Sequence, residues 1–342
     1  MMKHLNLGWL LLGRRRRYVD THKFCNQLPL TKDAFYTKLS FYIISRTTRS
    51  FKMDSISWAE IMLISKMNAM RTKETTMYRF ANFYRQPQHL KLDTPDCINV
   101  RDDLSCRDKI CSWTYSVIDH FQLSRQTVAI SMDLFDRYLA TTGNMCDTNQ
   151  ALLTSLTTLC IAIKINEKKK VKICTVAKLS RDLFTSQDIE RMEIKIMKSL
   201  SWLVNPPTTC DFISHIIMML PQTASTQTRH ETYEMSRYLA ELSVCDPFFV
   251  EQDKSTVALA TILNVLEDDI SSADLPRRSR EDFLNYVTRN FAWFAENVSR
   301  VNDCRDRLRH LKWEQEERPN GNTDDKRSSS PTSVLNSKGT KR

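Results

Sequence analysis

Apolar residues along most of the chain recur every three or four positions, which is the spacing of one face of an α-helix. From Leu104 onward this pattern predicts five helices, the first with Ile110, Trp113 and Val117 on one face. The third predicted helix begins near Thr148 and is apolar nearly all round. Because a helix without a polar face must be surrounded by others, we predict an all-α fold with this helix at its core.

Capping and breaking residues indicate where these helices begin and end. Ser124 is predicted as the N-cap of the second helix and Ser186 as the N-cap of the fifth. A short fourth helix is predicted over Thr175–Phe184. The run Asn205–Pro207 contains two prolines that cannot continue a helix, so we place a domain boundary there.

Residues 208–311 repeat the same order of helices. The run Thr256–Leu266 is again apolar nearly all round, and it is followed by a predicted helix over FLNYVTRNFAWF and a charged helix ending at Leu311. Before both units in the sequence, a separate helix is predicted from Ile56 to about Tyr84. Pro87, three residues later, prevents it from continuing. The pattern therefore predicts two tandem five-helix units with an N-terminal helix.

Polar and basic segments are expected to flank these units. The last segment ends SSSPTSVLNSKGTKR, a composition that cannot bury enough apolar surface to fold alone. The predicted segments are a basic, loosely ordered arm (1–54), a helical extension and loop (55–100), a first domain (101–206), a second domain (207–312) and a disordered tail (313–342).

The charge of the chain is concentrated in the predicted arm. Eleven Lys and Arg against two Asp in residues 1–53 account for +9 of the net charge of +10, so the body is nearly neutral. A neutral body disfavours nucleic acid as a partner. The basic arm is consistent with import into the nucleus, which is the expected location, with the cytoplasm as the alternative.

Other residue types exclude further classes of protein. The chain has five glycines, and only Gly143 lies between residues 14 and 320, which argues against phosphate-cradling loops. Its ten cysteines include no CxxC pair, and we expect buried free thiols. The histidines are scattered without metal spacing or a nucleophile beside them. No apolar run approaches the length of a membrane span. We therefore expect no enzyme, cofactor, metal, small-molecule substrate or membrane partner.

Several motifs then occur in order along the first unit. Arg107 and Trp113 form RxxxxxW in its first helix, and Asp136–Leu139 spells DRYL in its second. AIKINE, with Lys164, ends the third helix, and RMEIKIMKSLSW, with Glu193, forms the fifth. With this order and spacing the chain resembles the cyclin family over about residues 70–300. The resemblance implies that the two units are the cyclin N-terminal domain, or cyclin box, and the cyclin C-terminal domain.

By this resemblance the protein would be a non-catalytic regulatory subunit that binds and activates a cyclin-dependent protein kinase in cell-cycle control. Such a kinase needs its strand lysine paired with a glutamate of its C-helix before ATP phosphates are oriented. A cyclin would hold that helix in place with an apolar groove edged by charged groups. The substrates of the kinase are further expected partners.

The resemblance also implies which residues contact the kinase. Lys164 and Glu193 match the lysine and glutamate of a polar clamp. The alternative is that they have no binding role, because a lysine at the end of a buried helix usually just extends its charged group into solvent. The motifs around both residues favour the clamp. For Trp202 two roles stay open: a contact with the kinase or a place in the hydrophobic core. The groove positions are matched by Ile165, Met197, Trp202 and Val204.

A second family site, which docks substrates, is only partly matched. Arg107, Ile110 and Trp113 are retained, but Lys109 stands where an apolar wall is expected and Ser116 where an acid is expected. A charge in the wall and a missing partner for the arginine of an Arg-x-Leu peptide would weaken docking. We therefore expect kinase activation to be better supported than substrate recruitment.

An alternative interpretation is a nucleic-acid-binding basal transcription factor of the wider cyclin-fold group. Such a protein would carry basic helices across both units and usually an N-terminal zinc ribbon. The nearly neutral body and the absence of a CxxC pair from the sequence favour the kinase regulator instead.

Overall fold

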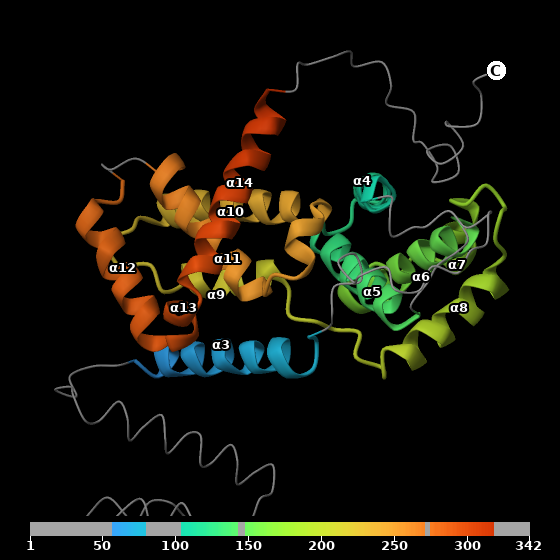
Figure 1. Ribbon diagram of the computed structural model, residues 1–342, viewed down its shortest axis with the longest axis horizontal. Helices are drawn as coiled ribbons and strands as arrows, with labels where there is room; N and C mark the ends of the chain where they lie inside the picture. The colour runs from blue at the N-terminus through green and yellow to red at the C-terminus, as the bar shows by residue number, and fades with distance from the viewer. Residues whose placement is uncertain (1–56, 80–103, 143–147, 271–273, 318–342) are drawn as a thin grey trace, which may run out of the picture. The chain divides into compact units, whose positions relative to one another are not determined.

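The computed structural model describes residues 57–79, 104–142, 148–270 and 274–317, and every regular element in these ranges is a helix (Figure 1). The all-α prediction is therefore confirmed. The chain divides into two compact units, 1–61 and 62–342, and the sections below concern the second. The predicted segment boundaries stay predictions.

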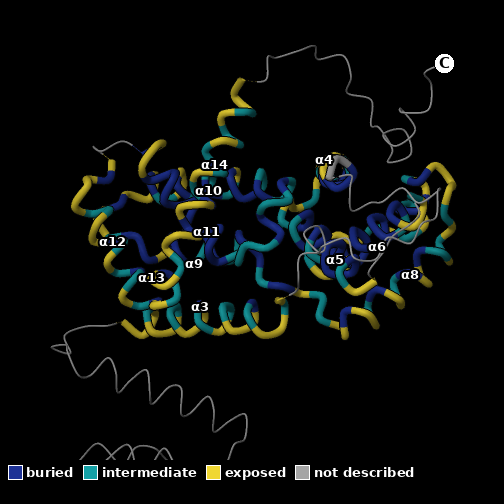
Figure 2. The backbone as a smooth tube through the Cα atoms, viewed as in Figure 1, coloured by how far each residue is buried: buried dark blue, intermediate teal, exposed yellow. Residues whose placement is uncertain are grey.

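The first repeat consists of the helices between Leu104 and Ser199, with α6 at its centre. Nearly every residue of α6 from Ala151 to Ile163 is buried, as its all-round apolar sequence predicts (Figure 2). Helices α5 and α8 pack against it. The bounds are α4 Leu104–His120, α5 Gln126–Thr142, α6 Thr148–Asn166, α7 Ile173–Lys178 and α8 Ser186–Ser199.

The second repeat is built in the same way around α11. All residues of α11 from Ser255 to Asn264 are buried, and α9, α10 and α14 pack against this helix. The bounds are α9 Thr209–Ile217, α10 Thr226–Cys245, η3 Pro247–Val250, α11 Lys254–Asn264, η4 Val265–Asp269, α12 Arg277–Asn290, α13 Ala292–Glu296 and α14 Val298–Glu316. Each repeat has its own hydrophobic core, and the non-helical run Asn205–Pro207 lies between α8 and α9.

Helix α3 (Trp58–Thr76) precedes both repeats but contributes to the second core. Its Met67 is fully buried among residues of α9 to α14. Near its end, Glu74 accepts hydrogen bonds from the backbone N–H of Ser255 (3.0 Å) and from its hydroxyl (2.7 Å). Asp253, at the N-cap position of α11, makes no side-chain capping bond. A carboxylate of α3 thus caps the central helix of the second repeat.

Arg71 completes a polar cluster at this contact. Its Nη1 lies 2.9 Å from Glu74 Oε2, 2.9 Å from Asp253 Oδ2 and 3.0 Å from the hydroxyl of Ser255. Its guanidinium also stacks 4.9 Å from the ring centroid of Trp293. Burial raises the pKa of Glu74, and the hydrogen bonds from Ser255 and Arg71 oppose that rise.

Helix starts differ from the prediction at two serines. The N-cap of α8 is Thr185, not Ser186, and Thr185 forms a capping box with Asp188. Helix α5 begins at Gln126, so Ser124 is one residue too early to be its N-cap. The backbone N–H of Ser124 instead donates to the carboxylate of Glu167 at 2.9 Å, which holds this loop against the end of α6.

Helix ends differ more than helix starts. Helix α3 ends at Thr76, well before Tyr84, which lies outside the described residues. Helix α7 ends at Lys178 rather than Phe184, because Arg181 and Asp182 take left-handed backbone angles. The helix predicted over FLNYVTRNFAWF is broken at Phe291 (φ −130°, ψ 82°) into α12 and α13.

The last helix continues past its predicted end. Helix α14 runs to Glu316, beyond Leu311 and into the segment predicted to be disordered from residue 313. Lys312 Nζ lies 2.5 Å from Asp269 Oδ1, so an ion pair ties this last part of α14 to η4. The remainder of the predicted tail lies outside the described residues, as does the predicted arm.

Candidate functional site

Lys164 and Glu193, predicted as the two members of a polar clamp, lie in contact in the structure. Lys164 is on the last turn of α6 and Glu193 is in the middle of α8, which packs against α6. Lys164 Nζ donates to both carboxylate oxygens of Glu193, each at 2.7 Å. The two helices therefore bring together residues that are 29 positions apart in the sequence.

The exposure of this pair indicates that it contributes little to the stability of the fold. The side chain of Lys164 is 49% exposed and that of Glu193 21% exposed. An exposed ion pair contributes roughly 0–1 kcal/mol. An ammonium group has three donors, and the carboxylate of Glu193 accepts from two of them. The pair therefore leaves hydrogen-bonding capacity on both side chains, and both are exposed to solvent in part.

The predicted groove residues lie on the same two helices and on the segment that follows α8. Ile165 is 36% exposed and Trp202 66% exposed, which places the indole outside the core. Met197 and Val204 are partly buried against the first core. We call Ile165, Met197, Trp202 and Val204 the rim patch.

Trp202 is presented by a strained turn at the end of α8. Ser201 (φ 51°) and Trp202 (φ 62°) both take left-handed angles, which are uncommon for residues other than glycine. The N–H of Trp202 donates to the carbonyl of Met197 at 2.9 Å, so the turn closes the C-terminus of α8. Backbone strain of this kind costs roughly 1–3 kcal/mol per residue and is commonest at functional sites.

Sequence reasoning did not include Ile194 in this surface. Ile194 is 53% exposed and follows Glu193 directly on α8. Its position in the sequence could have indicated this exposure, because Ile194 does not share the face of α8 that is buried. That face consists of Ile189, Met192, Ile196 and Leu200. An isoleucine on the polar face of an amphipathic helix is itself an indication of a binding surface.

The residues predicted for substrate docking are all buried. Ile110 and Trp113 belong to the first core, with 4% and 6% exposure. Arg107 forms a bidentate ion pair with Asp136, with Nε–Oδ1 at 3.0 Å and Nη2–Oδ2 at 2.7 Å. Because these side chains offer a peptide little surface, their exposure gives no support to the docking role, which stays a prediction.

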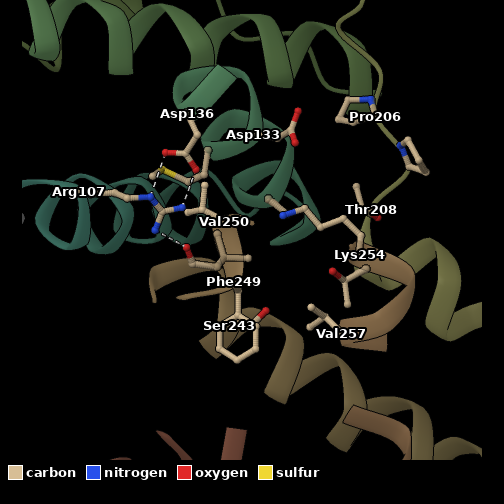
Figure 3. Close-up of a pocket in the computed structure, with 15 residues that line it drawn as sticks. Arg107, Asp133, Asp136, Pro206, Thr208, Ser243, Phe249, Val250, Lys254 and Val257 are labelled. Atoms are coloured by element: carbon tan, nitrogen blue, oxygen red, sulfur yellow. Dashed lines mark hydrogen bonds and ion pairs between the residues drawn. The ribbon is translucent and has the colours of Figure 1, made fainter. Parts of the chain in front are cut away.

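A small cavity lies where the two repeats meet, beside Arg107 (Figure 3). Asp133 of α5, Pro206 and Lys254 of α11 also line it, and its volume of about 40 Å³ suits water-sized molecules. Asp133 lies 3.2 Å from Arg137, and burial raises its pKa. The cavity has no room for a nucleotide or a peptide.

The described part of the chain contains no group of His, Cys, Asp and Glu arranged to hold a metal ion. Within those same residues no helix is both long and apolar enough to cross a membrane. The contact between Lys164 and Glu193 beside exposed apolar side chains makes this surface of α6 and α8 the best-supported candidate site.

Comparison with known proteins matches this part of the chain. The family model "Cyclin, N-terminal domain" matches residues 79–205, which include Lys164 and Glu193. The chain is 26% identical to cyclin-D3-3 of Arabidopsis thaliana over 167 residues, 48% of this chain and 45% of that protein. It is 28% identical to the G1/S-specific cyclin-E of Caenorhabditis elegans over 161 residues, 45% of this chain and 31% of that protein. These matches thus span less than half the length of either relative.

The fold is similar to a solved structure. The X-ray structure of a viral cyclin from herpesvirus saimiri superposes with a TM-score of 0.54 at 16% identity, covering 72% of this chain and 97% of that chain. This similarity concerns the fold, and it extends across both repeats because it covers more of the chain than the first repeat alone. The family match and the curated relatives show that the chain is similar to cyclins over its first repeat, and the solved structure shows that its fold is that of a cyclin.

Proposed function

We propose that this protein is a regulatory subunit that binds and activates a cyclin-dependent serine/threonine protein kinase in cell-cycle control, with no catalytic step of its own. The observation that carries the proposal is the contact between Lys164 and Glu193 beside the exposed rim patch. The cyclin family supports the same role, since the relatives include proteins named as G1/S-specific cyclins.

The geometry suits the capture of a helix from a partner. Burying the exposed part of the Trp202 indole against a partner would contribute roughly 3 kcal/mol of binding free energy. Lys164 would donate to a free backbone carbonyl, and Glu193 would accept from a free backbone amide, in the non-helical segment that adjoins the kinase C-helix. A helix held at both its apolar face and its end keeps its glutamate turned towards the ATP-binding lysine.

Two details of the site favour binding to a partner over a structural role. The ion pair contributes little to folding at this exposure. The turn at Ser201 and Trp202 has a strained backbone and leaves the indole of Trp202 exposed, and neither property stabilises the free protein. Both features therefore have a cost or a neutral effect in the free protein and become favourable only with a partner. A nuclear location is part of the proposal, supported by the basic run Arg14–Arg17.

The direct test compares two double variants for kinase binding and activation. Lys164→Ala with Glu193→Ala removes the clamp, whereas Glu190→Ala with Lys195→Ala removes one acid and one base from exposed positions of α8. The parent and the control should capture a cyclin-dependent kinase and raise its activity. The clamp variant should bind at least about thirtyfold more weakly, the loss expected for truncating hydrogen-bonded charges at an interface.

Circular dichroism should give the same helical content for all three proteins, since both pairs lie at the surface. Equal binding by the clamp variant and the parent would show that the clamp assignment is wrong. If the parent protein captures no cyclin-dependent kinase, either from lysate or from a panel of purified kinases, the proposed function as a whole is refuted.

A further inference from the structure

Two cysteines from different repeats lie with their sulfur atoms in contact. Cys111 is on α4 of the first repeat and Cys245 is the last residue of α10 of the second. Their Sγ atoms are 2.9 Å apart although the residues are 134 positions apart in the sequence. Cys111 is fully buried, whereas Cys245 is partly exposed. The pair thus joins the two repeats, with Cys245 as its less buried member.

The contact is held in register by residues spaced four apart on α4, which share one face of that helix. One turn before Cys111, Arg107 Nη1 donates to the carbonyls of Val244 (2.8 Å) and Cys245 (3.1 Å). One turn after it, the hydroxyl of Tyr115 donates to the carbonyl of Glu241 at 3.1 Å. Polar bonds on both sides of the thiols therefore fix the end of α10 against α4.

The two thiols differ in acidity. The hydrogen bond from Cys111 lowers the pKa of Cys245 and Arg107 acts in the same direction, although burial and the charges of Asp108 and Asp246 oppose this shift. Burial raises the pKa of Cys111 well above its ordinary value. Cys245 is also the less buried of the two thiols, so we assign it as the one that meets an oxidant first and Cys111 as its buried partner. This division suits a peroxidatic and a resolving cysteine.

We propose that Cys111 and Cys245 form a redox modification site at which a hydroperoxide converts the two thiols to a disulfide between α4 and α10. The Cys245 thiolate attacks one peroxide oxygen, the O–O bond breaks, and Cys245 becomes a sulfenic acid while the other oxygen leaves as hydroxide or alkoxide. Cys111 then attacks the sulfur of Cys245, an S–S bond forms, and water leaves. In total the two thiols lose two electrons and two protons and the peroxide is reduced.

Little movement is needed for this reaction. The S–S bond is about 2.05 Å long, so the sulfur atoms must approach by about 1 Å. The product would close a loop that includes most of the first repeat and all of α9 and α10, and thus restrict the unfolded chain. A thiol reductant would reverse it. The proposal does not depend on the proposed kinase role.

The test treats the reduced full-length protein with hydrogen peroxide, blocks remaining thiols by alkylation and maps the digest by mass spectrometry. The expected product is a peptide pair linked through Cys111 and Cys245, lighter by two hydrogen atoms, which a thiol reductant splits. Cys111→Ser and Cys245→Ser should each abolish it. Cys174→Ser is the matched control, because Cys174 is an exposed thiol on α7, and it should leave the link intact.

A second measurement follows the midpoint of thermal unfolding. Oxidation should raise the midpoint of the parent and of the control variant and leave those of the other two variants unchanged. The proposal fails if Cys111 and Cys245 of the parent are both recovered alkylated after peroxide has oxidised Cys174. It also fails if either cysteine is recovered linked to a different one. Peptide mapping of the parent protein alone detects either of these two outcomes. The test therefore does not require that the serine variants fold.

Discussion

The cluster that joins α3 to the second repeat allows a prediction with a definite magnitude. Replacing Arg71 with alanine removes the cation that lies 2.9 Å from both Glu74 and Asp253. Glu74 is buried, and taking one partner from a buried ion pair costs about 3–5 kcal/mol. Two features reduce this: Ser255 still donates two hydrogen bonds to Glu74, and Arg300 lies 3.5 Å from Asp253. We therefore expect a loss of about 3 kcal/mol, at the lower end of that range.

This loss should be local to the second repeat. In native-state hydrogen exchange, about 3 kcal/mol corresponds to roughly a hundredfold faster exchange of the most protected amides. We expect this change in α11 and in Met62–Thr76 of α3, with the amides of α6 in the first repeat unchanged. Urea unfolding followed by circular dichroism should show a matching shift of the transition that belongs to the second repeat.

The control variant is Lys73→Ala, which removes an exposed cation from the same turn of α3. A surface substitution of this kind should change stability by less than about 0.5 kcal/mol. Should Arg71→Ala and Lys73→Ala give the same exchange rates in α11, the reasoning about the buried cluster would be refuted. Faster exchange in α6 as well would show that the two repeats unfold together.

Three further predictions concern titration, capping and the rim patch. Folding raises the pKa of Glu74 above 4.5, so its contribution to stability is complete below that pH and is lost as pH rises through the folded pKa. The free energy of unfolding of the parent, from urea titrations, should therefore fall relative to that of Glu74→Gln as pH rises from 4.5. Thr185→Ala should cost about 1 kcal/mol in urea unfolding and Ser186→Ala much less, because Thr185 is the N-cap; equal losses would contradict this. Trp202→Ala should leave stability nearly unchanged but weaken kinase binding by roughly thirtyfold in calorimetry, a result that a core tryptophan could not give.

The central helices were predictable because their signal is contained in a single stretch of sequence. Helices α6 and α11 are apolar nearly all round, and both are buried along almost their whole length. Lys164 and Glu193 could be paired only through the resemblance to a family, since no periodicity indicates that residues on two helices will meet. The breaks and starts were harder. Phe291 ends α12 without any proline or glycine nearby, and Thr185 precedes a serine that caps equally well.

Contacts between distant segments could not be predicted from local patterns. Glu74 is a charged residue in a polar stretch, and such residues are rarely buried. Its burial depends on Ser255, which is 181 positions away. Arg107 was recognised as part of a motif, but its bonds to the carbonyls of Val244 and Cys245 appear only when the repeats are in place. Ile194 lies outside the buried stripe of α8, so the apolar periodicity that marks the core does not select it.

The cap that Glu74 gives to α11 affects how this chain should be divided for experiments. The family match begins at residue 79, after α3 has ended. A fragment that begins at that residue would keep both repeats and yet lack Met67 and the carboxylate that accepts from the backbone N–H of Ser255 at the start of α11. Such a fragment would be expected to express poorly or aggregate, and its failure would reveal nothing about kinase regulation. Recombinant work on this protein should start no later than Met62.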